Sequence, residues 1–222
     1  MTQEINIEKK ASDVVQPVDE DETRQAIRTK KDLSGANLRG LKLDNLNTVG
    51  ATLRKADLTA SDLSHGLLVN PNFYRANLHG AAVHNTLFIG GDLVKTDFRE
   101  ANLGDSLLLS VDAQNANFEG ASLRDAALVS ANLENADFTK ANLNNARLAS
   151  LNVTGADFTD ADLTGARAYH VDWTTAKVPP TLLPEPLINI PRWAWSVLIG
   201  GFLGIIGVLI YGMTRKKRKI SS

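Results

Sequence analysis

The sequence predicts an all-β solenoid, because its apolar residues recur every five positions, a period that fits neither a helix nor a flat strand. Every fifth residue from Leu33 to Val178 gives 30 positions in one phase, and 27 of them are Leu, Phe, Val or Trp. The residue two places earlier is Ala at 17 positions, and the residue between is Asn or Asp at 19. Isolated units cannot bury this apolar row, so we expect stacked coils with rungs about 4.8 Å apart. Asn and Asp tolerate turn dihedrals, so we expect them to stabilise the corners.

Several units have a sequence that points to a known family: ANLRG, ADLTA, ANLHG, ANFEG, ADFTK and ADLTG. Over residues 31–178 they resemble the A(D/N)LXX units of pentapeptide repeat proteins. The resemblance implies a right-handed quadrilateral parallel β-helix with four units per coil, and it favours a prokaryotic host. It does not specify the function, because one fold hosts many activities.

The N-terminal segment, residues 1–30, is polar and lies outside the repeat. Residues 1–18 are expected to be disordered, whereas DEDETRQAIRTKK has acids near its start and bases near its end, an order that favours a short helix. Such a helix would cap the open end of the solenoid. The first ten residues contain no apolar h-region, so no export signal is visible.

The C-terminal part predicts a membrane anchor. Residues 179–192 form a proline-rich, extended linker, and residues 193–213 contain no charged side chain. As a helix, 193–213 would span about 31 Å, enough to cross a bilayer, and a narrow β-helix has nowhere to bury it instead. Its ends carry interfacial aromatics, and the tail 214–222 is basic, which is typical of contact with headgroups. The residues assigned to the membrane interface are Trp193, Trp195, Tyr211, Arg215, Lys216, Lys217, Arg218 and Lys219.

The orientation of this single-pass, tail-anchored protein follows from two opposing signals. The basic tail predicts a cytoplasmic C-terminus, but no signal is visible that would export the repeat domain. We therefore expect the repeat domain to face the cytoplasm. Gly200, Gly204 and Gly207 place small residues on one helix face, which would allow pairing into a homodimer, although glycine is also common in membrane helices.

The sequence offers no enzyme signature: it has no GxSxG, HExxH or phosphate-loop pattern, and no cysteine. We therefore expect a non-enzymatic protein without a cofactor or metal. His65 and His84 should stack close together, so metal binding is an alternative to ordinary surface histidines. Residues 31–178 carry 13 basic and 17 acidic side chains, which argues against binding nucleic acid.

One side of the predicted coil is unusual, because the residues flanking its core positions are apolar. Four units per coil place residues twenty apart above one another, so these flanking residues should form an outward ladder. An apolar patch of this kind typically marks an interaction site, although such residues also suit a strand. We expect a partner protein, a second copy or the N-terminal segment to cover it. This apolar face comprises Leu67, Val69, Leu87, Ile89, Leu107, Leu109 and Val129.

These observations favour a membrane-anchored scaffold that docks a protein on the apolar face. The alternative is a DNA mimic that protects a topoisomerase, as some members of the resembled family protect DNA gyrase. A DNA mimic requires a strongly acidic rod, whereas residues 31–178 have a net charge of only −4.

Overall fold

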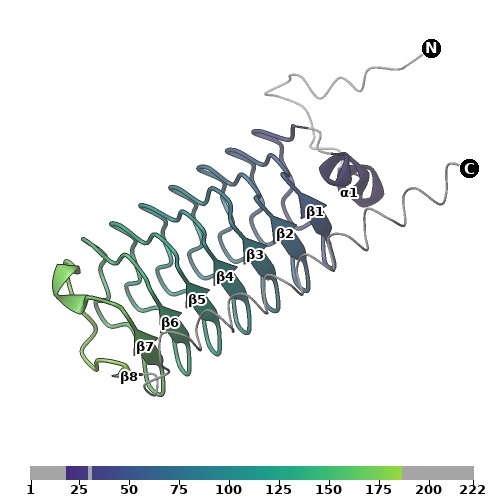
Figure 1. Ribbon diagram of the computed structural model, residues 1–222. Coiled ribbons are helices and arrows are strands. Elements are labelled where there is room, and N and C mark those ends of the chain that lie inside the picture. The colour runs from purple at the N-terminus through teal and green to yellow at the C-terminus, as the bar shows by residue number, and fades with distance from the viewer. Residues whose placement is uncertain (1–18, 30–31, 187–222) are drawn as a thin grey trace, which may run out of the picture. The chain divides into compact units, whose positions relative to one another are not determined.

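The computed structural model describes residues 19–29 and 32–186 of the 222-residue chain. The chain divides into two compact units, Met1–Glu185 and Pro186–Ser222, and the second is described only at Pro186. The first unit is a parallel β-solenoid of about seven coils with one α-helix beside its first strand (Figure 1). Each coil contributes one short strand: β1 (Asn47–Val49), β2 (Leu67–Val69), β3 (Leu87–Ile89), β4 (Leu107–Leu109), β5 (Ala127–Val129), β6 (Arg147–Ala149) and β7 (Arg167–Tyr169).

The other three sides of each coil are held by single parallel bridges between residues that are mostly twenty apart. The first turn side begins with the bridge Asp32–Thr52, the second with Asn37–Asp57 and the third with Lys42–Asp62. The side formed by β1–β7 is called the strand side. The all-β parallel solenoid with four units per coil is therefore confirmed, and its handedness stays a prediction.

The core follows the five-residue period. Aromatic side chains stack along the second turn side, where ring centroids are 5.0 Å apart for Phe98 and Phe118 and 4.7 Å for Phe118 and Phe138. Phe158 continues the stack at 4.9 Å from Phe138, and Trp173 closes it edge-on at 5.4 Å from Phe158. The small residue two places before each core residue is buried at most coils, which lets the backbone turn inward close to the core.

Asn and Asp stabilise the corners of the turn sides as expected, but the turn dihedral belongs to a different residue. Every fifth residue from Gly35 to His170 has a positive φ, and this residue lies two places after the core residue. Most of these residues are not glycine; Lys55 and Glu100 are examples, with φ of 56° and 57°. The Asn or Asp one place before the core instead forms the bridges and stabilises the corner through its side chain. The left-handed residue was missed because Gly, Asn, Ser, Lys and others share this position.

Helix α1 (Glu20–Arg28) lies within the stretch where the order of charges favoured a helix. The Asp19 side chain caps its N-terminus by accepting a hydrogen bond from the Asp21 N–H at 2.9 Å. Ile27 is buried against the first coils, and α1 packs on β1. The helix thus covers part of the edge that the first coil would otherwise expose.

The C-terminal end of the solenoid departs from the strict period. The 3-10 helix η1 (Trp173–Thr175) replaces a turn, and Asp157 then bridges Val178, 21 residues away instead of 20. In the described part of the expected linker, Pro180 is buried and the Glu185 N–H donates to the Ala166 carbonyl at 3.2 Å. Strand β8 (Glu185–Pro186) follows β7 in the sheet.

The membrane anchor is not part of this description. No helix within residues 19–29 and 32–186 is both long and apolar enough to cross a bilayer. The expected span 193–213, its interfacial residues, the glycines at 200, 204 and 207 and the basic tail all lie outside the described residues.

Candidate protein-interaction face

The apolar face lies on the strand side and is held in register. Leu67 pairs with Leu87, Leu87 with Leu107, and Leu107 with Ala127. On the other edge of the same strands, Val69, Ile89, Leu109 and Val129 align in the same way. The two rows flank the buried core residues Leu68, Phe88, Leu108 and Leu128. Two parallel apolar rows therefore run along four consecutive coils.

The exposure of the apolar face is lower than an outward ladder would suggest. Val69 is only 7% exposed, and the other six members are partly buried. Equivalent side chains stack about 4.8 Å apart, so each covers part of its neighbours. Val49 on β1 is 42% exposed and extends the row formed by Val69, Ile89, Leu109 and Val129. Both rows of the face are therefore partly accessible, and Val69 contributes mainly to packing.

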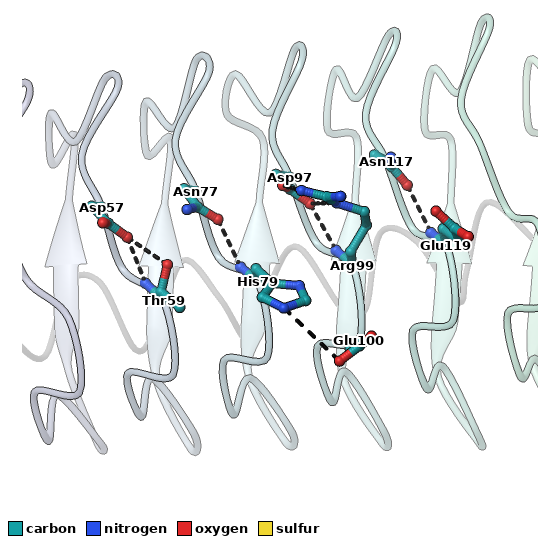
Figure 2. A network of polar contacts seen from close by, with 9 residues as sticks. All are labelled: Asp57, Thr59, Asn77, His79, Asp97, Arg99, Glu100, Asn117 and Glu119. Atoms are coloured by element: carbon teal, nitrogen blue, oxygen red, sulfur yellow. Dashed lines mark hydrogen bonds and ion pairs between the residues drawn. The ribbon is translucent and has the colours of Figure 1, made fainter.

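The turn sides differ from the strand side in the residue that precedes the core position. There the Asn or Asp before the core residue accepts a hydrogen bond from the N–H two residues later (Figure 2). These bonds measure 3.1 Å for Asp57 to Thr59, 3.0 Å for Asp97 to Arg99 and 2.8 Å for Asn117 to Glu119. In the strands β2–β5 this position is Leu or Ala, which lacks an acceptor, and the backbone continues as an extended strand.

The polar ladder of Figure 2 also contains the ion pair between Asp97 and Arg99 and a contact between His79 and Glu100, both near the surface. Arg99 Nη2 lies 2.6 Å from Asp97 Oδ2, and His79 Nε2 lies 3.9 Å from Glu100 Oε2. Burial acts to raise the pKa of Asp97, but hydrogen bonds from the side chain and N–H of Arg99 outweigh it and lower that pKa. Exposed pairs of this kind contribute little to stability, so this ladder is a corner support and not a reactive site.

Comparison with known proteins agrees with this geometry. A family model described as a pentapeptide repeat region matches residues 81–158, and a second, described as pentapeptide repeats in eight copies, matches residues 32–68. Together they cover more than half of the chain. The chain belongs to the pentapeptide repeat family. No curated protein sequence gives a significant match.

Solved pentapeptide repeat structures also align with the chain. A trypsin-treated variant of QnrB1, a plasmid-mediated fluoroquinolone resistance protein, is 25% identical; the match covers 75% of this chain and 95% of that one, with a TM-score of 0.45. HetL, involved in heterocyst differentiation regulation in the cyanobacterium Nostoc sp. strain PCC 7120, is 24% identical over 68% of this chain and 86% of its own, with a TM-score of 0.36.

The histidines lie where the twenty-residue stacking predicts. The ring centroids of His65 and His84 are 5.2 Å apart in an edge-on arrangement. His79 lies on the second turn side and His84 on the third, so the two project from different sides of the coil. Among the described residues, no three His, Asp or Glu side chains converge in a way that could hold a metal ion. Metal binding by His65 and His84 therefore has only two candidate ligands.

A basic cluster on the first turn side was missed at the sequence level. It comprises Arg54, Lys55, Tyr74, Arg75 and Lys95, which occupy the corner of three consecutive coils, and it is called the basic corner. The guanidinium carbons of Arg54 and Arg75 lie over the Tyr74 ring, 5.1 Å and 5.2 Å from its centroid. The signal is present in the sequence, because the twenty-residue stacking places Lys55, Arg75 and Lys95 above one another.

Proposed function

We propose that this pentapeptide repeat protein is a non-enzymatic, membrane-anchored scaffold that docks a partner protein on its apolar face. The observation that carries the proposal is the in-register alignment of two apolar rows over β2–β5. Partly exposed apolar side chains in a continuous patch are typical of protein interfaces. A rigid solenoid presents such a patch without the entropic cost of ordering a flexible surface.

The membrane anchor is proposed from sequence, on the uncharged stretch 193–213 and the basic residues that follow it. We place the repeat domain on the cytoplasmic side, because no export signal is visible in the sequence. In this arrangement the scaffold would hold its partner close to a membrane surface.

The alternative of a topoisomerase-directed DNA mimic is weaker. Such a protein needs a continuous acidic surface that resembles the DNA backbone. Here Arg54, Lys55, Arg75 and Lys95 interrupt the acidic surface over three coils, and all four are exposed. The distribution of charge therefore favours the scaffold.

A photocrosslinking amino acid at Val49, an exposed residue that pairs with Val69 at the edge of the apolar face, tests the scaffold in native membranes. We expect a specific crosslinked species that disappears when Leu87→Asn and Leu107→Asn are introduced together. Asn occupies the equivalent position on the turn sides, for example at Asn77 and Asn117, so the solenoid should tolerate both changes.

The matched control is Ala82→Asn with Ser122→Asn, which places the same residue at the same position of the unit on the third turn side. It should leave crosslinking unchanged. The same species from the parent and from the Leu87→Asn/Leu107→Asn variant would show that the apolar face is not the docking site. A species of twice the mass of the chain would identify the partner as a second copy.

A further inference from the structure

The basic corner stacks three cationic side chains directly above one another. Lys55, Arg75 and Lys95 occupy the same corner position of consecutive coils, and each N–H donates to a carbonyl of the next coil at 2.9–3.0 Å. Successive coils lie about 4.8 Å apart, so the three charges span about 10 Å, a distance close to the Debye length. Neighbouring charges in this row are therefore closer than the Debye length and repel one another, while salt weakens the repulsion between the outer two.

None of the four cations of the basic corner forms an ion pair with a described residue. The pKa of Asp32 is lowered mainly by hydrogen bonds from Ser34, and the charge of Arg54 adds only a small further lowering. Lys55, Arg75 and Lys95 are exposed and have no side-chain hydrogen bond within the described residues. Their charges are therefore available to an external anion.

The fold does not require these residues. Lys55, Arg75 and Lys95 have φ of 56°, 58° and 59°, a left-handed conformation in which Gly, Asn and Asp are more favourable. The equivalent corner in the next three coils carries Asn115, Asn135 and Gly155. Local backbone preference and mutual repulsion both oppose three long basic residues here, which indicates a role in binding.

The acidic residues around the basic corner limit the class of anion that can bind there. Glu134 lies on the same corner two coils beyond Lys95, and Asp105 and Asp125 stack on the diagonally opposite corner. A long polyanion such as nucleic acid that ran along the basic corner would extend past it and meet Glu134, whereas Asp105 and Asp125 keep the far corner acidic. A short convex ridge fits a flat anionic surface, where several phosphate groups are presented side by side.

We propose that the basic corner binds the phosphate groups of anionic phospholipid headgroups. The inference rests on the proposed membrane anchor, which would keep such headgroups within reach of the solenoid. Tyr74 holds the guanidinium groups of Arg54 and Arg75 over its ring and so reduces the entropy lost when they contact phosphate. The strand side is a different side of the coil, so the apolar face remains accessible to a protein partner.

Energy transfer to an acceptor-labelled lipid tests this on the full-length chain, which contains no cysteine and can be labelled at a single introduced one. Gln114→Cys places the donor on the first turn side, one coil beyond Lys95, and Ser122→Cys places it on the third turn side of the same coil. With vesicles of phosphatidylcholine and phosphatidylglycerol, transfer should be stronger from Gln114→Cys. The difference should vanish with phosphatidylcholine alone and in the variant Lys55→Gln/Arg75→Gln/Lys95→Gln.

The control Lys140→Gln/Arg147→Gln/Arg167→Gln removes the same charge from other exposed positions and should keep the difference. Equal transfer from the two labels in anionic vesicles, or an equal loss in both triple variants, would overturn the proposal. At the strength usual for basic residues near an anionic leaflet, the three substitutions at the corner correspond to a roughly 100-fold loss of headgroup binding.

Flotation of the same samples separates this inference from the anchor. Recovery with neutral vesicles reports the anchor alone. Recovery only with anionic vesicles, lost in the Lys55→Gln/Arg75→Gln/Lys95→Gln variant, would refute the anchor and support the basic corner. Recovery with neither vesicle would refute both. Binding of inorganic phosphate or an oligonucleotide without recovery on anionic vesicles would assign the corner to another anion.

Discussion

At the scale of single residues, the turn sides of the solenoid are stabilised by Asn and Asp side chains that accept hydrogen bonds from nearby backbone N–H groups. Asp157 accepts from both the Thr159 N–H, at 3.0 Å, and the Thr159 hydroxyl, at 2.6 Å. The Thr159 hydroxyl, the Lys177 ammonium at 3.0 Å and the Thr159 N–H lower the pKa of Asp157, since all three favour the ionised carboxylate. Asp162 and Asp172 accept from threonine in the same way, and their pKa values are also lowered.

These carboxylates predict loss of stability in acid. A pKa that is lower in the folded state than its ordinary value of 3.8 adds stability above that value, and the stability is lost as the pH falls through the folded pKa. The free energy of unfolding should therefore decrease below about pH 4. Asp157→Asn keeps an acceptor oxygen for the Thr159 N–H but no longer titrates, so its free energy of unfolding should depend less on pH than that of the parent.

Denaturant titrations at neutral and acidic pH measure this effect. Asp160→Asn is the control, because Asp160 is exposed and makes no side-chain hydrogen bond to a described residue. It should keep the pH dependence of the parent. If Asp157→Asn and Asp160→Asn lose the same amount of stability between the two pH values, the corner hydrogen bonds do not set the acid response.

Gly91 makes a second prediction at the residue scale. Its φ is +106°, and a Cβ built there would lie 2.6 Å from Pro71 Cδ and 2.7 Å from the Pro71 carbonyl oxygen. Gly91→Ala should lower the free energy of unfolding by about 2 kcal/mol or more, because the neighbouring backbone must shift. Gly80→Ala is the matched change: its φ is +63°, it has open space, and Ala60 already occupies the equivalent corner. A cost of about 1 kcal/mol or less is expected there, and equal costs for the two variants would contradict the steric explanation.

At the scale of elements, α1 takes the place of a missing coil. In the interior, the carbonyls of Asp62 and Ser64 on the third turn side accept from N–H groups of the preceding coil. Lys42 and Asp44 have no preceding coil, and Arg24 donates to their carbonyls at 2.5 Å and 2.7 Å. The Glu20 side chain accepts from the Lys42 N–H at 3.2 Å. One coil further on, the Leu41 carbonyl accepts from the Asp62 N–H in the same way. Two side chains of α1 thus supply all three bonds of one rung.

Arg24→Ala should therefore open the first coil selectively. Leaving two ladder carbonyls without a donor costs about 1–3 kcal/mol, and the loss is local because each coil contacts only its neighbours. Hydrogen exchange should accelerate at residues 38–45 and stay unchanged at residues 138–145. Arg28→Ala, at an exposed position in the last turn of the same helix, should leave both regions unchanged. Equal acceleration of exchange in both variants would mean that the hydrogen bonds of Arg24 are not what protects the first coil.

Much of this architecture follows from residue spacing, because the five-residue period specifies the core and the twenty-residue stacking aligns Leu87 with Leu107. The remainder depends on contacts that spacing does not contain. Arg24 reaches a rung 18 to 20 residues away, and nothing in DEDETRQAIRTKK distinguishes it from Arg28. Val69 belongs to the apolar row by position but is buried. The one-residue shift at Val178 arises from η1, which a strict period cannot anticipate.

At the scale of the whole solenoid, the four sides are chemically distinct although the units look alike. The second turn side contains the aromatic stack, the strand side the apolar face and the first turn side the basic corner. Each property depends on residues twenty apart staying on one side. These three features therefore require that each unit stays on its side of the coil, in addition to keeping the five-residue period.

Deletions test this requirement. Removing residues 111–130 takes out one whole coil, so Phe98 would meet Phe138 and Leu108 would meet Leu148, each on its original side.

Removing residues 116–125 takes out only two units but moves every later unit by two sides, so Phe98 would meet Leu128 and Leu108 would meet Phe138. The shorter deletion breaks the aromatic stack and places Ala127, and then Arg147 and Arg167, where the second turn side has an Asn or Asp acceptor. Mismatched core sizes and lost corner bonds at the junction should cost roughly 2–5 kcal/mol. Circular dichroism during denaturant unfolding should therefore show the shorter deletion to be the less stable protein, and a shorter deletion as stable as the longer one would mean that the four sides are interchangeable.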